Sequence, residues 1–215
     1  MIPYKQNDRS VGFIFSPKKR GAFMKTKEIL LHAAMEQFSE HGYNGAGLQA
    51  IAEHAGIRKS SIYHHFSSKE ELFLGVVESV YEAYVENLRS LVSQGHGPRE
   101  ILEQTALYLK TSWNGQFFFR FIQFPPPEAE ESVHRKFLQF EADCTTILQP
   151  VLQSFLERYG VSAAQLSDVL DAYYVLLDGW CVQALYYGET DKKQKQDASW
   201  NMFEAGIRGV GGRWN

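Results

Sequence analysis

The sequence predicts an all-α protein in which an N-terminal three-helix helix-turn-helix domain is joined by a long helix to a larger C-terminal helical domain. Three observations predict this class. Apolar residues recur at three- and four-residue spacing through most of the chain. Residues 42–66 contain two very short amphipathic segments around a glycine. No segment shows the alternation of a convincing strand, and we find no internal repeat. We place the helix-turn-helix domain at residues 24–72 and the second domain at 73–215.

The first 23 residues have no helical period, and we expect a disordered leader there. Its five-residue apolar run is too short for a signal peptide. Lys18, Lys19 and Arg20 could form a basic arm that reaches a minor groove; alternatively, translation starts at Met24. The first helix is expected from about Lys25 to His41, ending at Gly42.

The next two predicted helices are too short to be stable alone and must pack on neighbours. The first buries four side chains on one face: Leu48, Ile51, Ala52 and Ala55. Gly56 is well placed to end it. The second runs from Ser60 to Phe66 and buries Ile62 and Phe66, which leaves polar and basic side chains facing outward. Such a face suits a DNA groove lined with phosphates.

Residues from about Lys25 to Val77 resemble the N-terminal domain of the TetR/AcrR family of bacterial transcriptional regulators. The matching residues are Ile29, Ala33, Ala34, Phe38, Gly42 and Tyr43; then Ile51, Ala52, Ala55, Gly56 and Ile57; then Ile62, Tyr63, His64, His65, Phe66, Lys69, Glu70 and Leu72. The resemblance implies a homodimer that binds a palindromic operator in double-stranded DNA. It also implies release of the DNA when a small molecule enters the C-terminal domain, with no cofactor.

Base contacts are expected from the start of the recognition helix, at Arg58, Lys59, Ser60 and Ser61. The resemblance implies phosphate contacts at Tyr63, His65 and Lys69, and we add His64 and Gln49 to the DNA-binding set. Adjacent histidines do not converge on one ion, so we predict no metal site. Two departures from the family remove helix caps: Ala46-Gly47 replaces the usual Ser/Thr pair, and Arg58 replaces the usual serine.

Charge is distributed unevenly along the chain. Residues 1–75 hold ten Lys and Arg against seven Asp and Glu, and residues 76–215 hold twelve against eighteen. The basic part carries the helix-turn-helix, as phosphate contact requires. The acidic remainder should keep the second domain away from DNA.

The remaining helices follow from apolar periodicity and from helix-ending residues. A connector helix begins with a capping box, formed by Ser67 with Glu70 or by Ser68 with Glu71, and extends to about Gln94. Its apolar stripe comprises Leu72, Val76, Val80, Tyr84, Leu88 and Leu91. Later helices are expected at 98–113, 116–124, 128–159 with a bend or break at Pro150, 166–185 and 191–210, with a turn at Asn114-Gly115.

An aromatic cluster marks the candidate ligand pocket. We assign the pocket wall to Tyr108, Trp113, Phe117, Phe118, Phe121 and Phe124. Glu141 and Asp178, like Glu103 and Asp143, lie in apolar surroundings and either face a cationic ligand or face solvent. The two cysteines, Cys144 and Cys181, are expected to be buried thiols rather than a disulfide.

The last two helices are expected to pair with their symmetry mates in a four-helix dimer interface. Its apolar stripe is Trp200, Phe203, Ile207 and Val210, part of which must also seal the protomer's own core. Gly179 and Ala184 would let the helices approach closely.

The leading functional hypothesis is a cytoplasmic, ligand-controlled repressor. An activator of the same family is an alternative. Two other classes are an enzyme with an accessory DNA-binding domain and a carrier of hydrophobic ligands. Residues 76–215 show no Ser-His-Asp set, phosphate-binding glycine loop or spaced metal cluster, so we assign no catalytic residue. No apolar run approaches the ~20 residues of a membrane span.

Overall fold

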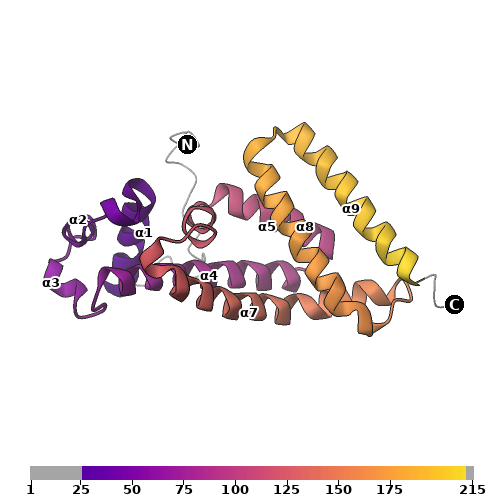
Figure 1. The fold of residues 1–215 in the computed structure, drawn as a ribbon, viewed down its shortest axis with the longest axis horizontal. Helices are drawn as coiled ribbons and strands as arrows, with labels where there is room; N and C mark the ends of the chain where they lie inside the picture. Colours follow the sequence, from indigo (N-terminus) through magenta and orange to yellow (C-terminus); the bar gives the residue numbers. More distant parts are fainter. Residues whose placement is uncertain (1–25, 212–215) are drawn as a thin grey trace.

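The computed structural model describes residues 26–211, and over that range the chain forms helices and no strand. The predicted leader, including Lys18–Arg20 and Met24, lies outside the described residues. The short helices α2 and α3 lie at one end of the elongated molecule, and α4 and α7 run side by side through its middle (Figure 1). The all-α prediction is therefore confirmed.

The first three helices form the predicted helix-turn-helix. Helix α1 (Thr26–Gly45) loses its helical backbone at Gly42, which has a positive φ of 75°, so the regular helix ends where the sequence predicted. Helix α2 spans Leu48–His54 and is followed by Gly56, also at positive φ. Helix α3 (Lys59–Ile62) is shorter than the predicted 60–66.

The shortening of α3 has a packing cause. After Ile62 the chain tightens into a turn, in which the N–H groups of His65 and Phe66 both donate to the carbonyl of Ile62. This turn carries the buried Phe66 ring onto α4, where Gly75 leaves room for it. A Cβ atom at Gly75 would lie 2.7 Å from that ring.

Helix α4 (Lys69–Ser93) is the predicted connector. Ser68 caps it by accepting a hydrogen bond from the Glu71 N–H at 3.0 Å, while the Glu71 carboxylate accepts from the backbone N–H and the hydroxyl of Ser67. Of the two predicted capping pairs, Ser68 and Glu71 therefore form the cap. The hydrogen bonds from Ser67 lower the pKa of Glu71. All six residues of the predicted apolar stripe are buried.

The middle of the chain differs from the prediction. Helix α5 (Pro98–Thr111) begins at its proline as expected, but Asn114 and Gly115 do not form a turn. They lie inside a short helix, α6 (Trp113–Phe117), whose cap is Ser112. A π-helical turn, η2 (Phe118–Ile122), and a 3-10 turn, η3 (Pro127–Ala129), follow. Helix α7 (Glu130–Glu157) then continues through Pro150 without a break.

The C-terminal helices complete the core. A 3-10 turn, η4 (Ala163–Gln165), leads into α8 (Leu166–Tyr186), and α9 spans Glu189–Gly211. Leu185 of α8 is 43% exposed, whereas the apolar residues that precede it at helical spacing are buried: Leu166, Leu170, Tyr173, Leu177 and Cys181. No helix among residues 26–211 has the length and apolar composition needed to cross a membrane.

The predicted dimer stripe of α9 lies largely inside the protomer. Trp200 and Ile207 are each 5% exposed, and the Trp200 ring packs against Phe155 and Phe203. Ser199 beside it accepts a hydrogen bond from the indole N–H of Trp180 in α8, at 2.8 Å. These two residues therefore belong to the core, which places them away from the face open to a partner.

Candidate nucleic-acid interface and effector cavity

The recognition helix α3 lies at one end of the molecule (Figure 1). Lys59 and Ser60 are exposed and Ser61 is partly exposed, whereas Ile62 is fully buried and fixes the helix on the domain core. Arg58 is the N-cap residue, in extended conformation, and its side chain makes no capping hydrogen bond. The guanidinium is exposed, and it could not cap the helix because it has no hydrogen-bond acceptor.

The residues after α3 continue this outward surface. Tyr63 is 52% exposed, and His64 and His65 are exposed beside it. Gln49, on α2, is also exposed, but its side-chain amide donates to Glu53 at 2.7 Å. The missing cap of α2 is visible in the structure, because Gly47 is its N-cap and no side chain caps the helix.

Lys69 lies behind this surface, in the first turn of α4. Its ammonium group lies 4.9 Å from the centre of the Tyr43 ring and donates weakly to the carbonyl of Asn44 at 3.4 Å. Partial burial lowers its pKa, although the charge of Glu128 acts in the opposite direction. The exchange of this long carbonyl contact for a phosphate oxygen would strengthen its hydrogen bonding.

The net charge of the folded domain is a poor guide to this surface. Residues 26–75 hold four Lys and Arg against six Asp and Glu, so the basic excess of the N-terminal part comes from residues before the described range. The positions of the individual charged side chains are more informative about DNA binding than the net charge. Glu36 accepts from His54 at 2.5 Å, and within residues 26–211 no acidic side chain pairs with Arg58 or Lys59. Both cations are available for DNA.

A small cavity lies between α4, α5, η2, α7 and α8 and has a volume of about 60 Å³. Its walls are mostly aromatic or apolar, with a few polar groups. The lining residues are Tyr84, Leu109, Phe118, Phe119, Gln123, Phe137, Phe140, Glu141, Cys144, Tyr174, Leu177, Asp178 and Cys181. The sequence contains a pattern that could have predicted this cavity. An apolar residue, an acidic residue and a cysteine follow one another at the same spacing on α7 (positions 140, 141 and 144) and on α8 (positions 177, 178 and 181).

The structure divides the eight residues predicted for the ligand pocket. Phe118, Glu141 and Asp178 line the cavity. Tyr108 lies behind its wall, with its ring 6.3 Å from that of Tyr84. The other four lie elsewhere: Phe117 and Phe121 are in the core, while Trp113 and Phe124 are 36% and 75% exposed.

Phe117 and Phe121 connect the cavity wall to the helix-turn-helix domain. Both rings contact Phe73 of α4, at centroid distances of 5.8 and 5.7 Å. Phe73 in turn contacts Phe38 and Tyr43, at 5.2 and 5.1 Å. One short segment, residues 117–122, thus contacts the cavity on one side and α1 on the other.

Arg120 makes a second connection that the sequence did not reveal. Its guanidinium donates to the carbonyl oxygen of Ser39, near the point at which α1 breaks at Gly42. The last carbonyls of a helix have no partner within the helix and carry partial negative charge. Arg120 therefore caps α1 from the C-terminal part of the chain.

Replacing Arg120 with Ala is expected to destabilise the end of α1 by about 1.5–3 kcal/mol, because a charge-assisted hydrogen bond is lost. Hydrogen exchange should show faster exchange of the amides around residues 42–46, with α8 unchanged. The control is Arg135→Ala, which removes an exposed pair with Glu131 and should change stability by less than about 1 kcal/mol. Unchanged exchange at 42–46 would show that this cap is unimportant.

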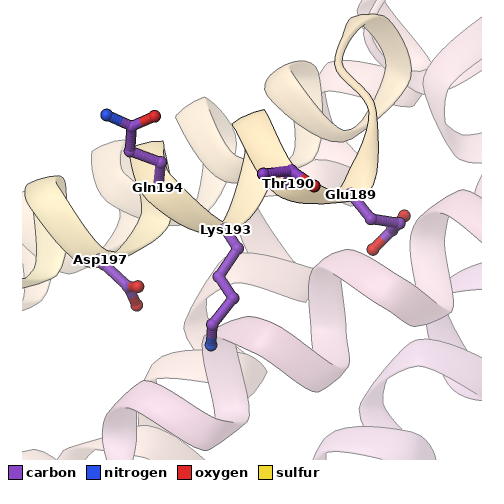
Figure 2. A pocket seen from close by; sticks show the side chains of 5 residues that line it. All are labelled: Glu189, Thr190, Lys193, Gln194 and Asp197. Atoms are coloured by element: carbon purple, nitrogen blue, oxygen red, sulfur yellow. The ribbon is translucent and has the colours of Figure 1, made fainter.

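A wider groove lies along the first half of α9 and has a volume of about 500 Å³. Figure 2 shows its lining residues, with Lys193 and Asp197 directed towards the neighbouring helix and Gln194 away from it. Arg99 and Lys110 of α5 form ion pairs with Asp197 and Glu189 at its edge. The groove is open, its lining residues are all polar or charged types, and none of them is aromatic.

Comparison with known proteins identifies the N-terminal domain. Residues 30–76 match the family described as "Bacterial regulatory proteins, tetR family". The chain is 48% identical over 65 residues to the HTH-type transcriptional activator FasR of Mycolicibacterium smegmatis, which covers 30% of this chain and 28% of FasR. It is 25% identical over 138 residues to the HTH-type transcriptional repressor NicS of Pseudomonas putida, covering 60% of this chain and 63% of NicS. Both matches span less than two thirds of the relative's length.

The fold is also that of solved regulators. A crystal structure of a TetR-family transcriptional regulator from Mesorhizobium loti superposes with a TM-score of 0.66 at 22% identity, covering 84% of this chain and 95% of that one. This likeness extends beyond the helix-turn-helix to the C-terminal helices, where sequence identity is low. The N-terminal domain is thus similar to that of TetR-family transcriptional regulators, and the fold of the described chain is that of a solved member of this family.

Proposed function

We propose that this protein is a homodimeric repressor that binds a palindromic operator and is released by a small hydrophobic ligand in the cytoplasm. The observation that carries the DNA-binding part is the outward α3, where Arg58 and Lys59 have no acidic partner within the described range. In this proposal, residues up to 72 contact DNA. Residues from 73 onward hold the ligand and the second protomer.

The outer faces of α8 and α9 support the dimer. Apolar and small residues recur at three- and four-residue spacing on the exposed side of each helix. They are Ala172, Val175, Gly179, Val182 and Tyr186 on α8, and Ala198, Met202, Ala205 and Gly209 on α9. Exposed apolar residues on two helices in contact with each other are typical of an interface. Gly179 lies in this stripe, whereas Ala184 is buried within the protomer.

Segment 117–122 supports coupling between ligand and DNA. A ligand releases DNA if it binds the DNA-incompetent arrangement more tightly than the other. The cavity must widen to hold a molecule larger than about 60 Å³, and Phe118 forms part of its wall. Movement of that wall would also displace Phe117, Phe121 and Arg120, which contact α4 and α1.

Direct DNA capture separates this proposal from a ligand carrier. The purified full-length protein would be incubated with sheared genomic DNA of its own organism, and the bound fragments would be sequenced. Enrichment of an inverted repeat supports a dimeric regulator. Recovery of fragments without a common site would contradict the proposal. Transcription in vitro from an enriched promoter then distinguishes repression from the activation suggested by the name of FasR.

Lys69→Ala is expected to weaken binding to every DNA sequence and to lower the salt dependence by about one phosphate contact. Lys59→Ala should instead change which bases are preferred, because a lysine in the major groove reads guanine. Fluorescence anisotropy over a salt series, with the operator and with scrambled DNA, measures both effects. The control is Lys136→Ala, whose ammonium pairs with Glu78 far along α4. A Lys69 variant with the same slope as this control would refute the assignment.

A further inference from the structure

We propose that the effector cavity selects an organic cation with an aromatic body. This proposal rests on the proposed function for its regulatory meaning, although the binding itself is independent of DNA. Three features of the cavity carry it: two carboxylates without a cationic partner, a wall of aromatic rings and a tyrosine hydroxyl of that wall without a hydrogen bond.

The charged groups of the cavity are both acidic. Glu141 of α7 and Asp178 of α8 line it, and none of its thirteen lining residues is a lysine, arginine or histidine. Asp178 is exposed as a whole residue, but its carboxyl group is partly desolvated, and this together with the charge of Glu141 raises its pKa. The two carboxyl groups are therefore within electrostatic reach of each other. Arg89 lies near Cys144, but within residues 26–211 it forms no ion pair with Glu141. A ligand cation would supply the missing positive charge.

The aromatic rings form a surface suited to such a cation. The Phe140 ring lies 5.0 Å from Tyr84, edge to face, and 6.0 Å from Phe118. Phe119 and Phe137 are partly buried at the cavity. Aromatic faces attract cations and also bury an apolar ring, so they favour an aromatic amine over a small inorganic ion.

The hydroxyl of Tyr84 offers a specific hydrogen bond. Tyr84 is 6% exposed and lines the cavity, and its hydroxyl has no hydrogen-bond partner among the described residues. The neighbouring Tyr174 differs, because its hydroxyl is paired with Thr145 at 2.8 Å. A ligand that hydrogen-bonds to the Tyr84 hydroxyl would gain a specific polar contact in a mostly apolar wall.

The two cysteines contribute apolar wall. Burial raises the pKa values of Cys144 and Cys181 to about 12, so both thiols stay neutral near pH 7. Neutral thiols neither balance a cation nor attack an electrophile at a useful rate. The negative charge of the cavity is therefore left to Glu141 and Asp178.

The size of the cavity indicates how the ligand enters. About 60 Å³ is well below the roughly 300–1,000 Å³ of an open ligand pocket, so binding must displace part of the wall. Gln123 is exposed, and Phe119 and Phe137 are partly buried, whereas Tyr84 and Phe140 are held in the core. Gln123, Phe119 and Phe137 therefore form the side of the cavity that is expected to move when a ligand enters.

Three probes with one ring system and different charge test the proposal: 2-naphthylmethylamine, which is protonated at pH 7.4, 2-naphthalenemethanol and 2-naphthoate. Calorimetric titration of the full-length protein should show the amine binding about tenfold more tightly than the alcohol, with the carboxylate weakest. Glu141→Gln and Asp178→Asn should each lower the affinity for the amine about three- to tenfold and leave the affinity for the alcohol unchanged. Tyr84→Phe should weaken both.

The matched control is Glu157→Gln, which removes an exposed carboxylate from the far end of the same helix as Glu141 and should change no affinity. Equal binding of the amine and the alcohol, preference for the carboxylate, or binding of none of the three overturns the proposal. So does an unchanged affinity of both acid variants. A gel shift on captured DNA is read separately: if the amine binds the cavity without releasing DNA, the ligand class stands and the release mechanism of the proposed function fails.

Discussion

The double substitution Val182→Glu and Met202→Glu is expected to give a folded monomer whose affinity for operator DNA is lower by about a hundredfold or more. The two side chains are 40% and 75% exposed, on the outer faces of α8 and α9. In a two-fold dimer the substitutions would place four carboxylates in one interface, where none has a cationic partner. Burial of charges without partners is strongly unfavourable. Each monomer would then bind one half-site without the help of the second.

Sedimentation velocity at micromolar concentration measures the assembly, and circular dichroism measures the helix content. Leu138→Glu is the control, because Leu138 is 54% exposed on α7 and lies outside the two stripes. This variant should remain dimeric and keep its DNA affinity. A monomeric wild type, or a double variant that stays dimeric, would exclude α8 and α9 as the interface.

A glutamate at Ile207 should unfold the protomer rather than dissociate the dimer. The sequence alone could not distinguish these two outcomes. Periodicity correctly predicted a helix with an apolar stripe through Trp200 and Ile207, but a single chain does not show which partner covers that stripe. Ile207 is 5% exposed within the protomer, so Ile207→Glu should unfold it rather than dissociate a dimer. The weaker stripe of Ala198, Met202 and Ala205 is the one left open.

The helix-turn-helix was predictable because its signals are local. Gly42 and Gly56 end helices at positive φ, and Ile62 and Phe66 are both buried as their spacing indicated. The length of α3 was not predictable, because it depends on a tertiary contact between the Phe66 ring and Gly75. The long helix α4 followed from its capping box and its apolar stripe.

The structure of the aromatic segment was harder to predict, because its backbone changes from α-helix in α6 to a π-helical turn in η2. Helical spacing places Phe117 and Phe121 on one face, and the structure agrees, since both contact Phe73. The π-helical turn at 118–122 directs Phe118 to the cavity instead. No residue type in this segment predicts a π-helical turn. The contact of Arg120 with Ser39 was also not predictable, because the two residues are 81 positions apart and meet only in the tertiary structure.

Gly115→Ala is expected to destabilise the protein by about 3 kcal/mol or more, at the upper end of the range for overpacked cores. Asn114-Gly115 reads as a turn in the sequence, but Gly115 serves a close approach between helices. A Cβ atom there would lie 2.1 Å from the carbonyl oxygen of Leu109 and 2.4 Å from its Cα. Because these are backbone atoms in the last turns of α5, they cannot rotate away as a side chain would.

The strain would reach the site through the short link between α5 and α6. Ser112 caps α6 by accepting from the Gly115 N–H at 2.9 Å, and Phe117 and Phe118 follow directly. Separation of the two helices would therefore shift both the contact with Phe73 and the cavity wall. Thermal and urea unfolding at fixed protein concentration should show a loss of roughly 6 °C or more in Tm. Gly97→Ala is the control, since nothing lies within 4 Å of its added Cβ and its cost should stay within about 1 kcal/mol. If the two variants unfolded at the same temperature, the close packing of α6 on α5 would be wrong, and with it the placement of residues 117–122.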